Sequence, residues 1–173
     1  MHLMAFSLSR EVPALHKKGV QIHFPGDRSR LSKGVTDGLL AAEALTANNS
    51  KLILNVCFNY GGRWDITQAA AAMAVELQNG QLTADQISEE QLAKRLSTYG
   101  LPDVDLLIRT GGDHRISNFL LWQAAYAELY FTPVLWPDFD EIVFSEAIAS
   151  FASRERRFGC TGEQVRALLV HPG

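Results

Sequence analysis

The chain alternates two kinds of apolar pattern, one spaced like a helix and one like a strand. Four stretches are predicted helices: 1–18, 31–48, 65–78 and part of 82–96, the last with a start signal at 88–91. Apolar residues recur every three or four positions in the second stretch and only imperfectly in the first. In the second stretch this spacing involves Val35, Leu39, Ala42 and Leu45. Such residues share one helix face, which we expect to face the core.

Short apolar runs rich in branched residues lie between these helices and predict strands at 20–24, 51–58, 104–108 and 128–131. In the second run Leu52, Leu54, Val56 and Phe58 share one face. That face is either plain core, which we favour, or the lining of a ligand cavity. The alternation of helices and strands predicts an α/β fold with a mainly parallel sheet flanked by helices.

The strand at 104–108 leads into the most informative stretch, Arg109-Thr-Gly-Gly-Asp-His-Arg-Ile-Ser117. A solvated basic turn is one interpretation. Two arginines, two glycines and a serine within nine residues favour an anion site, since arginine forks hold phosphates by charged hydrogen bonds. Ser117 is a predicted N-cap of a helix starting at 119, whose N-terminus and free amides would add to the site. Asp113 is expected to orient the arginines.

Composition narrows the setting. A chain of 173 residues fits one domain, and a net charge of −3 gives no general attraction to nucleic acid. Cys57 and Cys160 have neither metal-ligand spacing nor the number needed for a disulfide framework. We find no apolar run of transmembrane length and no secretory signal in these residues. A cytoplasmic protein is therefore expected.

The end of the chain predicts a last helix beginning after Asp138 or Asp140, with apolar positions Phe144, Ile148 and Phe151. The basic segment 154–159 follows, and its simplest interpretation is a solvated helix terminus. Residues 160–173 are expected to form a flexible tail.

Three motifs resemble those of the bacterial cis-prenyltransferases. The longest runs from 109 to 123 and continues through 126–131 and 135–139. A second motif is Asn59-Tyr-Gly-Gly-Arg63, and 154–159 matches a terminal Arg-x-Gly element. The resemblance covers nearly the whole chain except its last dozen residues. It implies a cis-prenyltransferase-like fold.

The resemblance also implies a reaction. Isopentenyl diphosphate would be added repeatedly to an allylic diphosphate, usually farnesyl diphosphate, with new double bonds in cis and with Mg²⁺ assisting. The product would be a long-chain polyprenyl diphosphate such as undecaprenyl diphosphate, a lipid carrier for cell-wall sugars. Membrane contact would be at most peripheral, through this lipid product.

The same resemblance assigns site residues. Arg109, Arg115 and Ser117 would bind the head of isopentenyl diphosphate. Glu128 would help with Mg²⁺, either indirectly or together with another acid. A different pair, Arg157 and Gly159, would reach the substrate site of a neighbouring subunit, which implies a homodimer. The resemblance also implies that Leu52 and Leu54 line a hydrophobic tunnel for the growing chain. With the resemblance, this interpretation stands equal to that of plain core.

The sequence departs from the family at its front. The Asp-Gly-Asn-Gly-Arg-Trp loop, which carries the Mg²⁺-binding aspartate and grips the allylic diphosphate, has no counterpart, and Arg63-Trp64 belongs to a different motif. We therefore expect 1–173 to be an N-terminally incomplete domain, its C-terminal two thirds, and assign no catalytic residue. Two smaller departures are Asp113, where glutamate is commoner, and Cys160, where a second glycine is usual.

These departures keep other functions open. One interpretation is a cis-prenyltransferase polypeptide, and the alternative is a non-catalytic diphosphate-binding partner subunit or an inactive fragment. A Mg²⁺-dependent phosphohydrolase would need an acidic cluster near Arg109, where Asp113 and Glu128 are the acids in view.

Overall fold

The computed structural model describes residues 2–154, with side chains from residue 10 onward. These residues form two compact units, which we call the N-terminal unit (up to Leu101) and the C-terminal unit (from Pro102). The single domain over 1–173 stays a prediction, and the tail at 160–173 lies outside the described residues. Within the described range, no helix has both the length and the apolar character needed to cross a bilayer.

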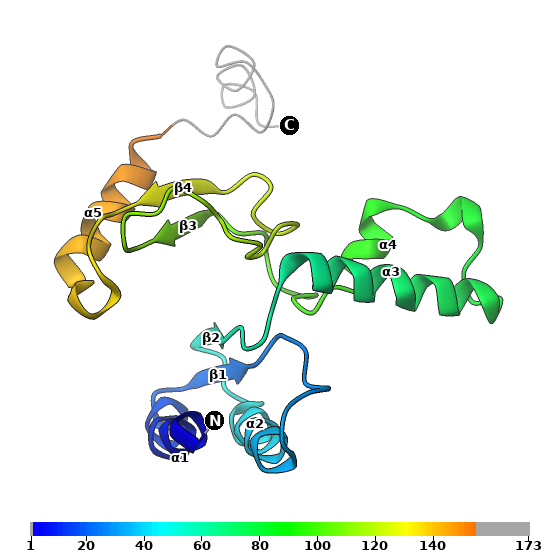
Figure 1. Ribbon diagram of the computed structural model, residues 1–173, viewed down its shortest axis with the longest axis horizontal. Helices are drawn as coiled ribbons and strands as arrows, with labels where there is room; N and C mark the ends of the chain where they lie inside the picture. Colours follow the sequence, from blue (N-terminus) through cyan, green and yellow to red (C-terminus); the bar gives the residue numbers. More distant parts are fainter. Residues whose placement is uncertain (1, 155–173) are drawn as a thin grey trace. The chain divides into compact units, whose positions relative to one another are not determined.

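The N-terminal unit follows the predicted alternation of helices and strands (Figure 1). Its elements are α1 (His2–Lys17), β1 (Val20–His23), α2 (Lys33–Thr46), β2 (Leu52–Asn55), α3 (Gly62–Gln78), a 3-10 turn (Ala84–Gln86) and α4 (Glu89–Ala93). The strands β1 and β2 pair in parallel, with Val20 opposite Leu52 and His23 opposite Asn55. The predicted strands and helices of this region are thus confirmed, apart from boundary shifts.

The core of the N-terminal unit lies where α1 and α2 pack on β1 (Figure 1). Its buried cluster consists of Val12, Val20, Ile22, Phe24, Val35, Leu39 and Ala42. The predicted apolar face of α2 is confirmed except at Leu45, which is 48% exposed. Thr46 takes the buried place instead, and its hydroxyl accepts a hydrogen bond from Ile22 N (3.0 Å) and donates one to Ala42 O (2.9 Å).

The face of β2 behaves differently from the core prediction. Leu54 packs against the buried cluster, but Leu52 is 58% exposed and Val56 39% exposed. The core interpretation is therefore wrong for Leu52 and Val56. The helices α1 and α2 pack mainly on β1. They therefore leave apolar side chains of β2 exposed.

The C-terminal unit consists of β3 (Leu106–Arg109), β4 (Glu128–Phe131), a 3-10 turn (Trp136–Asp138) and α5 (Glu141–Ala152). The two strands pair in parallel, and α5 contacts β4 (Figure 1). Asp140 caps α5, because its Oδ1 accepts from Ile142 N and Val143 N at 3.0 Å each. The prediction of a parallel α/β arrangement is confirmed in both strand pairs.

The prediction of a helix after Ser117 is wrong. Residues 117–126 form turns, and the backbone is left-handed at Ser117 (φ +47°), Asn118 (φ +64°) and Leu120 (φ +46°). Left-handed residues cannot continue a right-handed helix. The apolar run 119–122 has ordinary helix formers, so its sequence carried no sign of this backbone path.

Candidate functional site

The loop after β3 is pinned by its own backbone. Gly111 and Gly112 both adopt positive φ (+86° and +79°), which glycine tolerates without strain. Their amides donate to Val134 O (2.8 Å) and Thr132 O (3.0 Å), and Thr132 N donates to Arg109 O (3.0 Å). The loop is thereby fastened to the segment that follows β4.

These backbone hydrogen bonds change the prediction of how an anion would be bound at this loop. The amides of Gly111 and Gly112 are already bonded to carbonyls and are not aimed at a ligand. Since no helix begins at Ser117, a helix N-terminus does not contribute either. Recognition of an anion at this loop therefore depends on side chains.

Those side chains form a connected group, which we call the arginine cluster: Arg109, Asp113, Arg115 and Ser117. Oδ2 of Asp113 accepts from Nη2 of Arg109 (2.7 Å) and from Nη2 of Arg115 (2.6 Å). Nη1 of Arg109 donates to Ser117 Oγ (2.7 Å) and to Arg115 O (2.6 Å). The predicted orienting role of Asp113 is borne out by these two contacts.

The charge and exposure of the arginine cluster suit an anionic ligand. Its two guanidinium groups share one carboxylate, which leaves a net positive charge. Exposure of the side chains rises from 24% for Arg109 through 42% for Asp113 to 65% for Arg115. Arg109 is thus the fixed end of the cluster, and Arg115 is the end that can turn toward a ligand.

His114 does not join the arginine cluster. Its ring stacks on Phe131 at the end of β4, with centroids 5.0 Å apart and planes inclined by 25°. This contact anchors the middle of the loop to the strand pair. The structure therefore gives His114 a packing role.

Glu128, the expected Mg²⁺ residue, lies at the start of β4 and is engaged by an arginine. Its Oε2 accepts from Nη1 of Arg154 (2.8 Å), and its side chain is 27% exposed. Within residues 2–154, no group of three or more histidine, cysteine, aspartate or glutamate side chains could hold a metal ion. Mg²⁺ favours carboxylate oxygens and waters, so the described residues do not fit an Mg²⁺ site by themselves.

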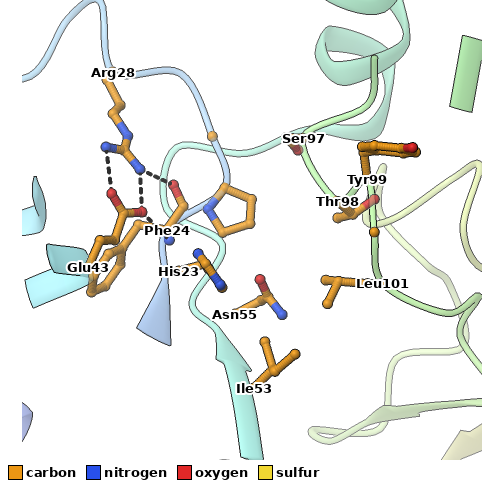
Figure 2. Close-up of a pocket in the computed structure, with 13 residues that line it drawn as sticks. His23, Phe24, Arg28, Glu43, Ile53, Asn55, Ser97, Thr98, Tyr99 and Leu101 are labelled. Carbon is orange, nitrogen blue, oxygen red and sulfur yellow. Dashed lines mark hydrogen bonds and ion pairs between the residues drawn. The ribbon is translucent and has the colours of Figure 1, made fainter. Parts of the chain in front are cut away.

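A second feature, missed by sequence reasoning, is a cavity of about 450 Å³ in the N-terminal unit. Figure 2 shows His23 and Asn55, at the carboxyl ends of β1 and β2, facing Thr98 and Leu101. Ligands of parallel sheets bind at this end of the strands. His23 and Asn55 are polar residues inside the predicted strands 20–24 and 51–58, and this was a signal for it.

The charges beside this cavity neutralise each other. Arg28 donates to both carboxylate oxygens of Glu43 (Nη2 to Oε1 at 2.6 Å, Nη1 to Oε2 at 3.1 Å) and to Phe24 O (3.0 Å), as the dashed lines of Figure 2 mark. Glu43 also accepts from Phe24 N (2.9 Å). A paired arginine of this kind supports the wall of the cavity and offers little free charge to an anion.

Asp65, two residues after the Asn59–Arg63 motif, holds a segment that lines the cavity. Asp65 is 2% exposed, and its two oxygens accept from Tyr60 Oη (2.9 Å) and Ser97 N (2.9 Å). Asp65 thereby connects the start of α3 to the segment 97–101, which lines the cavity. Burial, and then the charge of Asp65, raise the pKa of the nearby Cys57 thiol, which keeps this cysteine protonated and unreactive.

The described residues thus bring Arg109, Arg115 and Ser117 together and place Glu128 on the neighbouring strand. The predicted residues Arg157 and Gly159 lie outside the described residues. Their role remains a prediction.

The chain is similar to known proteins in sequence and in structure. Residues 1–159 match the sequence profile of a family described as "Putative undecaprenyl diphosphate synthase". The ditrans,polycis-undecaprenyl-diphosphate synthase ((2E,6E)-farnesyl-diphosphate specific) of Vibrio parahaemolyticus is 52% identical over 170 residues. The match covers 98% of this chain and 68% of that relative, so the chain spans about two thirds of its length.

Two solved structures are similar as well. Lavandulyl diphosphate synthase from Lavandula x intermedia, crystallised with dimethylallyl diphosphate, has a TM-score of 0.88 and 37% identity over 92% of this chain and 69% of its own. A probable undecaprenyl diphosphate synthase from Campylobacter jejuni has a TM-score of 0.79 and 34% identity, with coverage of 91% and 72%. Both matches extend through most of the chain.

Proposed function

The chain belongs to the undecaprenyl diphosphate synthase family of cis-prenyltransferases, and on this premise we propose that its arginine cluster is the isopentenyl diphosphate half of a prenyl-transfer site. The reaction is the repeated condensation of isopentenyl diphosphate onto farnesyl diphosphate. Its product is a long-chain polyprenyl diphosphate such as undecaprenyl diphosphate. The relatives' names support both the class of reaction and the allylic substrate.

The observation that carries the proposal is the shared carboxylate of Asp113. It holds the guanidinium groups of Arg109 and Arg115 within reach of one another and leaves a net positive charge on the exposed side. A diphosphate can take the hydrogen bonds of Arg115 and, beside it, the hydroxyl of Ser117. Fixing the diphosphate orients the alkene of isopentenyl diphosphate toward an allylic carbon, and such positioning lowers the barrier by several kcal/mol.

The proposal assigns this chain one half of the chemistry. Bound Mg²⁺ would supply charge neutralisation for the departing allylic diphosphate. The described residues do not compose its site, and Glu128 is held by Arg154. Glu128 as an Mg²⁺ residue, Arg157 and Gly159 as substrate residues, and a cytoplasmic homodimer remain parts of the proposal.

A second candidate is a non-catalytic diphosphate-binding partner subunit. The lack of an Asp-Gly-Asn-Gly-Arg-Trp motif in the sequence favours it for the 173-residue chain acting alone. A phosphohydrolase is disfavoured, since residues 2–154 lack the acidic cluster that such an enzyme needs.

An activity assay tests how much of the site this chain holds. Labelled isopentenyl diphosphate, farnesyl diphosphate and Mg²⁺ should give little or no product with this chain alone. Full turnover would reject the assignment of half a site.

Substitution of Arg115 by alanine tests the site itself. The change should weaken isopentenyl diphosphate binding by about 2–3 kcal/mol, roughly 30- to 150-fold, because charged hydrogen bonds are lost. Titration calorimetry measures the affinity. The matched control is Arg10→Ala, which removes an arginine whose side chain is 76% exposed in the other unit. Equal affinities for the two variants would reject the assignment.

A further inference from the structure

The amino ends of β1 and β2 carry cations and no acids. Lys17 ends α1, Lys18 follows it, and Lys51 precedes β2. All three side chains are exposed, and we call them the lysine platform. Neither 14–22 nor 47–54 contains an aspartate or a glutamate. This surface is therefore positive on a chain whose net charge is −3.

Hydrogen bonds fix the two segments that carry the lysine platform. Lys51 N donates to Gly19 O (3.0 Å), and Asn49 Nδ2 donates to Val20 O (2.7 Å). The amide of Gly19 in turn donates to His16 O (2.9 Å). The end of α1 and the loop before β2 thus form one ordered base for the lysines.

Gly19 lets Lys51 approach the end of α1. Its φ is +79°, in the left-handed region that glycine adopts without strain. A Cβ at this position would lie 2.9 Å from Cδ of Lys51, so the aliphatic stem of Lys51 lies against the backbone that directly follows Lys18. The charges of Lys18 and Lys51 therefore belong to one surface.

No carboxylate neutralises this surface. Among residues 10–154, the lysines of the platform take part in no ion pair, unlike Lys33, which pairs with Asp37 (2.8 Å), and Lys94, which pairs with Glu90 (2.6 Å). The full charge of the platform is therefore available to an anionic partner.

The dipole of α1 explains only part of this arrangement. Cations are stabilised near the carboxyl end of a helix, which suits Lys17 and Lys18. Lys51 lies outside the helix, at the start of β2. The dipole also gives no reason for the lack of acids in both segments.

The residue types of the platform favour a membrane surface as the partner. Lysine is a compact, hydrated charge that suits a diffuse anionic surface, whereas the fork of arginine grips single phosphates. Leu52 follows Lys51 and is 58% exposed. Lysines beside an exposed apolar side chain are typical of surfaces at the bilayer interface. A nucleic-acid site would more commonly add aromatic side chains for stacking on bases.

We propose that the lysine platform binds bilayers that contain anionic phospholipids. The lysines contact the headgroup phosphates, and Leu52 lies at the boundary between headgroups and acyl chains. The proposal goes beyond the proposed activity, because the contact is made by the protein's own surface and is tested without substrate.

Sedimentation of the full 173-residue chain with lipid vesicles tests the proposal. The chain should sediment with vesicles of phosphatidylglycerol and phosphatidylcholine and stay in solution with phosphatidylcholine alone. About 1 M salt should abolish the binding, because the Debye length is then only about 3 Å. A chain that stays in solution with both kinds of vesicle, or that binds both equally, would overturn the proposal.

Three variants separate the platform from charge in general. Glutamine in place of its three lysines should weaken vesicle binding about 100-fold, since each lysine near an anionic surface contributes about fivefold. Arginine at the same positions keeps the charge and should bind like the original chain. The matched control carries Arg10→Gln, Lys33→Gln and Lys94→Gln, which remove three paired cations and give the same net charge as the glutamine variant. It should also bind like the original chain.

Two results with these variants would overturn the proposal. One is equal vesicle binding by the glutamine variant and the matched control, with circular dichroism showing both folded. The other is a single-stranded oligonucleotide that binds the original chain more tightly than the vesicles do and loses affinity in the glutamine variant. That result would assign the lysine platform to nucleic acid.

Discussion

In the N-terminal unit, seven side chains from α1, β1, α2 and the residue after β1 form one buried cluster. In the described part of the C-terminal unit, Leu107 and Ala147 are the buried apolar residues, while Trp136 and Ile142 are 75% and 69% exposed. The C-terminal unit nevertheless carries the arginine cluster, whose geometry is set by hydrogen bonds.

This contrast separates two tasks along the chain. Apolar packing around β1 stabilises the N-terminal unit, and a network of charged side chains shapes the candidate site in the other unit. Core substitutions should therefore change stability with little effect on ligand contacts. Substitutions in the arginine cluster should do the reverse.

The largest expected effect is on the core of the N-terminal unit. Leu39→Ala removes a side chain that is 1% exposed and should lower the free energy of unfolding by about 2–5 kcal/mol. Urea unfolding measures the loss, and hydrogen exchange should accelerate in β1 but not in β3. Its neighbour Leu40 is 51% exposed, so Leu40→Ala should change stability by less than about 0.5 kcal/mol. Similar losses of unfolding free energy in Leu39→Ala and Leu40→Ala would contradict the account in which the buried cluster stabilises the N-terminal unit.

A smaller effect is expected at the helix cap of the C-terminal unit. Asp140→Ala removes the acceptor for Ile142 N and Val143 N and should cost about 0.5–2 kcal/mol. Faster hydrogen exchange in the first turn of α5 would report it. Asp140→Asn keeps a capping oxygen and should stay close to the original stability. If the alanine variant exchanges no faster than the asparagine variant, the cap does not stabilise α5.

The smallest effect is a pH dependence in the N-terminal unit. A hydrogen bond from Arg95 holds the pKa of the Glu76 carboxyl below its ordinary value of 4.5. A carboxyl whose folded pKa is depressed stabilises the protein above its unfolded pKa and loses this contribution as pH falls through the folded pKa. The stability difference between the original chain and Glu76→Gln should therefore shrink as pH drops below 4.5. A difference independent of pH in thermal unfolding would contradict this.

Much of the fold could be predicted from local sequence. The apolar spacing in α2 placed Val35 and Leu39 in the core, and Asp140 was one of the two aspartates predicted to precede α5. The burial of Thr46 was not predictable, because its hydroxyl is satisfied by an amide of another element, Ile22 N in β1. That meeting depends on tertiary structure.

The candidate site was predictable in its side chains and not in its backbone. Residue types alone indicated that Arg109, Asp113 and Arg115 would form an anion site, and the structure brings them together. The helix expected at Ser117 was wrong, and the amides of the two glycines do not add to the site. The reason is that carbonyls beyond β4 accept those amides and that left-handed residues replace the helix.

Titration calorimetry of this chain with isopentenyl diphosphate, with and without Mg²⁺, tests the central claim most directly. The original chain should bind saturably, and Arg109→Ala should not, since Arg109 connects Asp113, Ser117 and the backbone of Arg115. Circular dichroism should show both proteins folded. A folded original chain that does not bind, or an Arg109→Ala variant that binds equally well, would contradict the account.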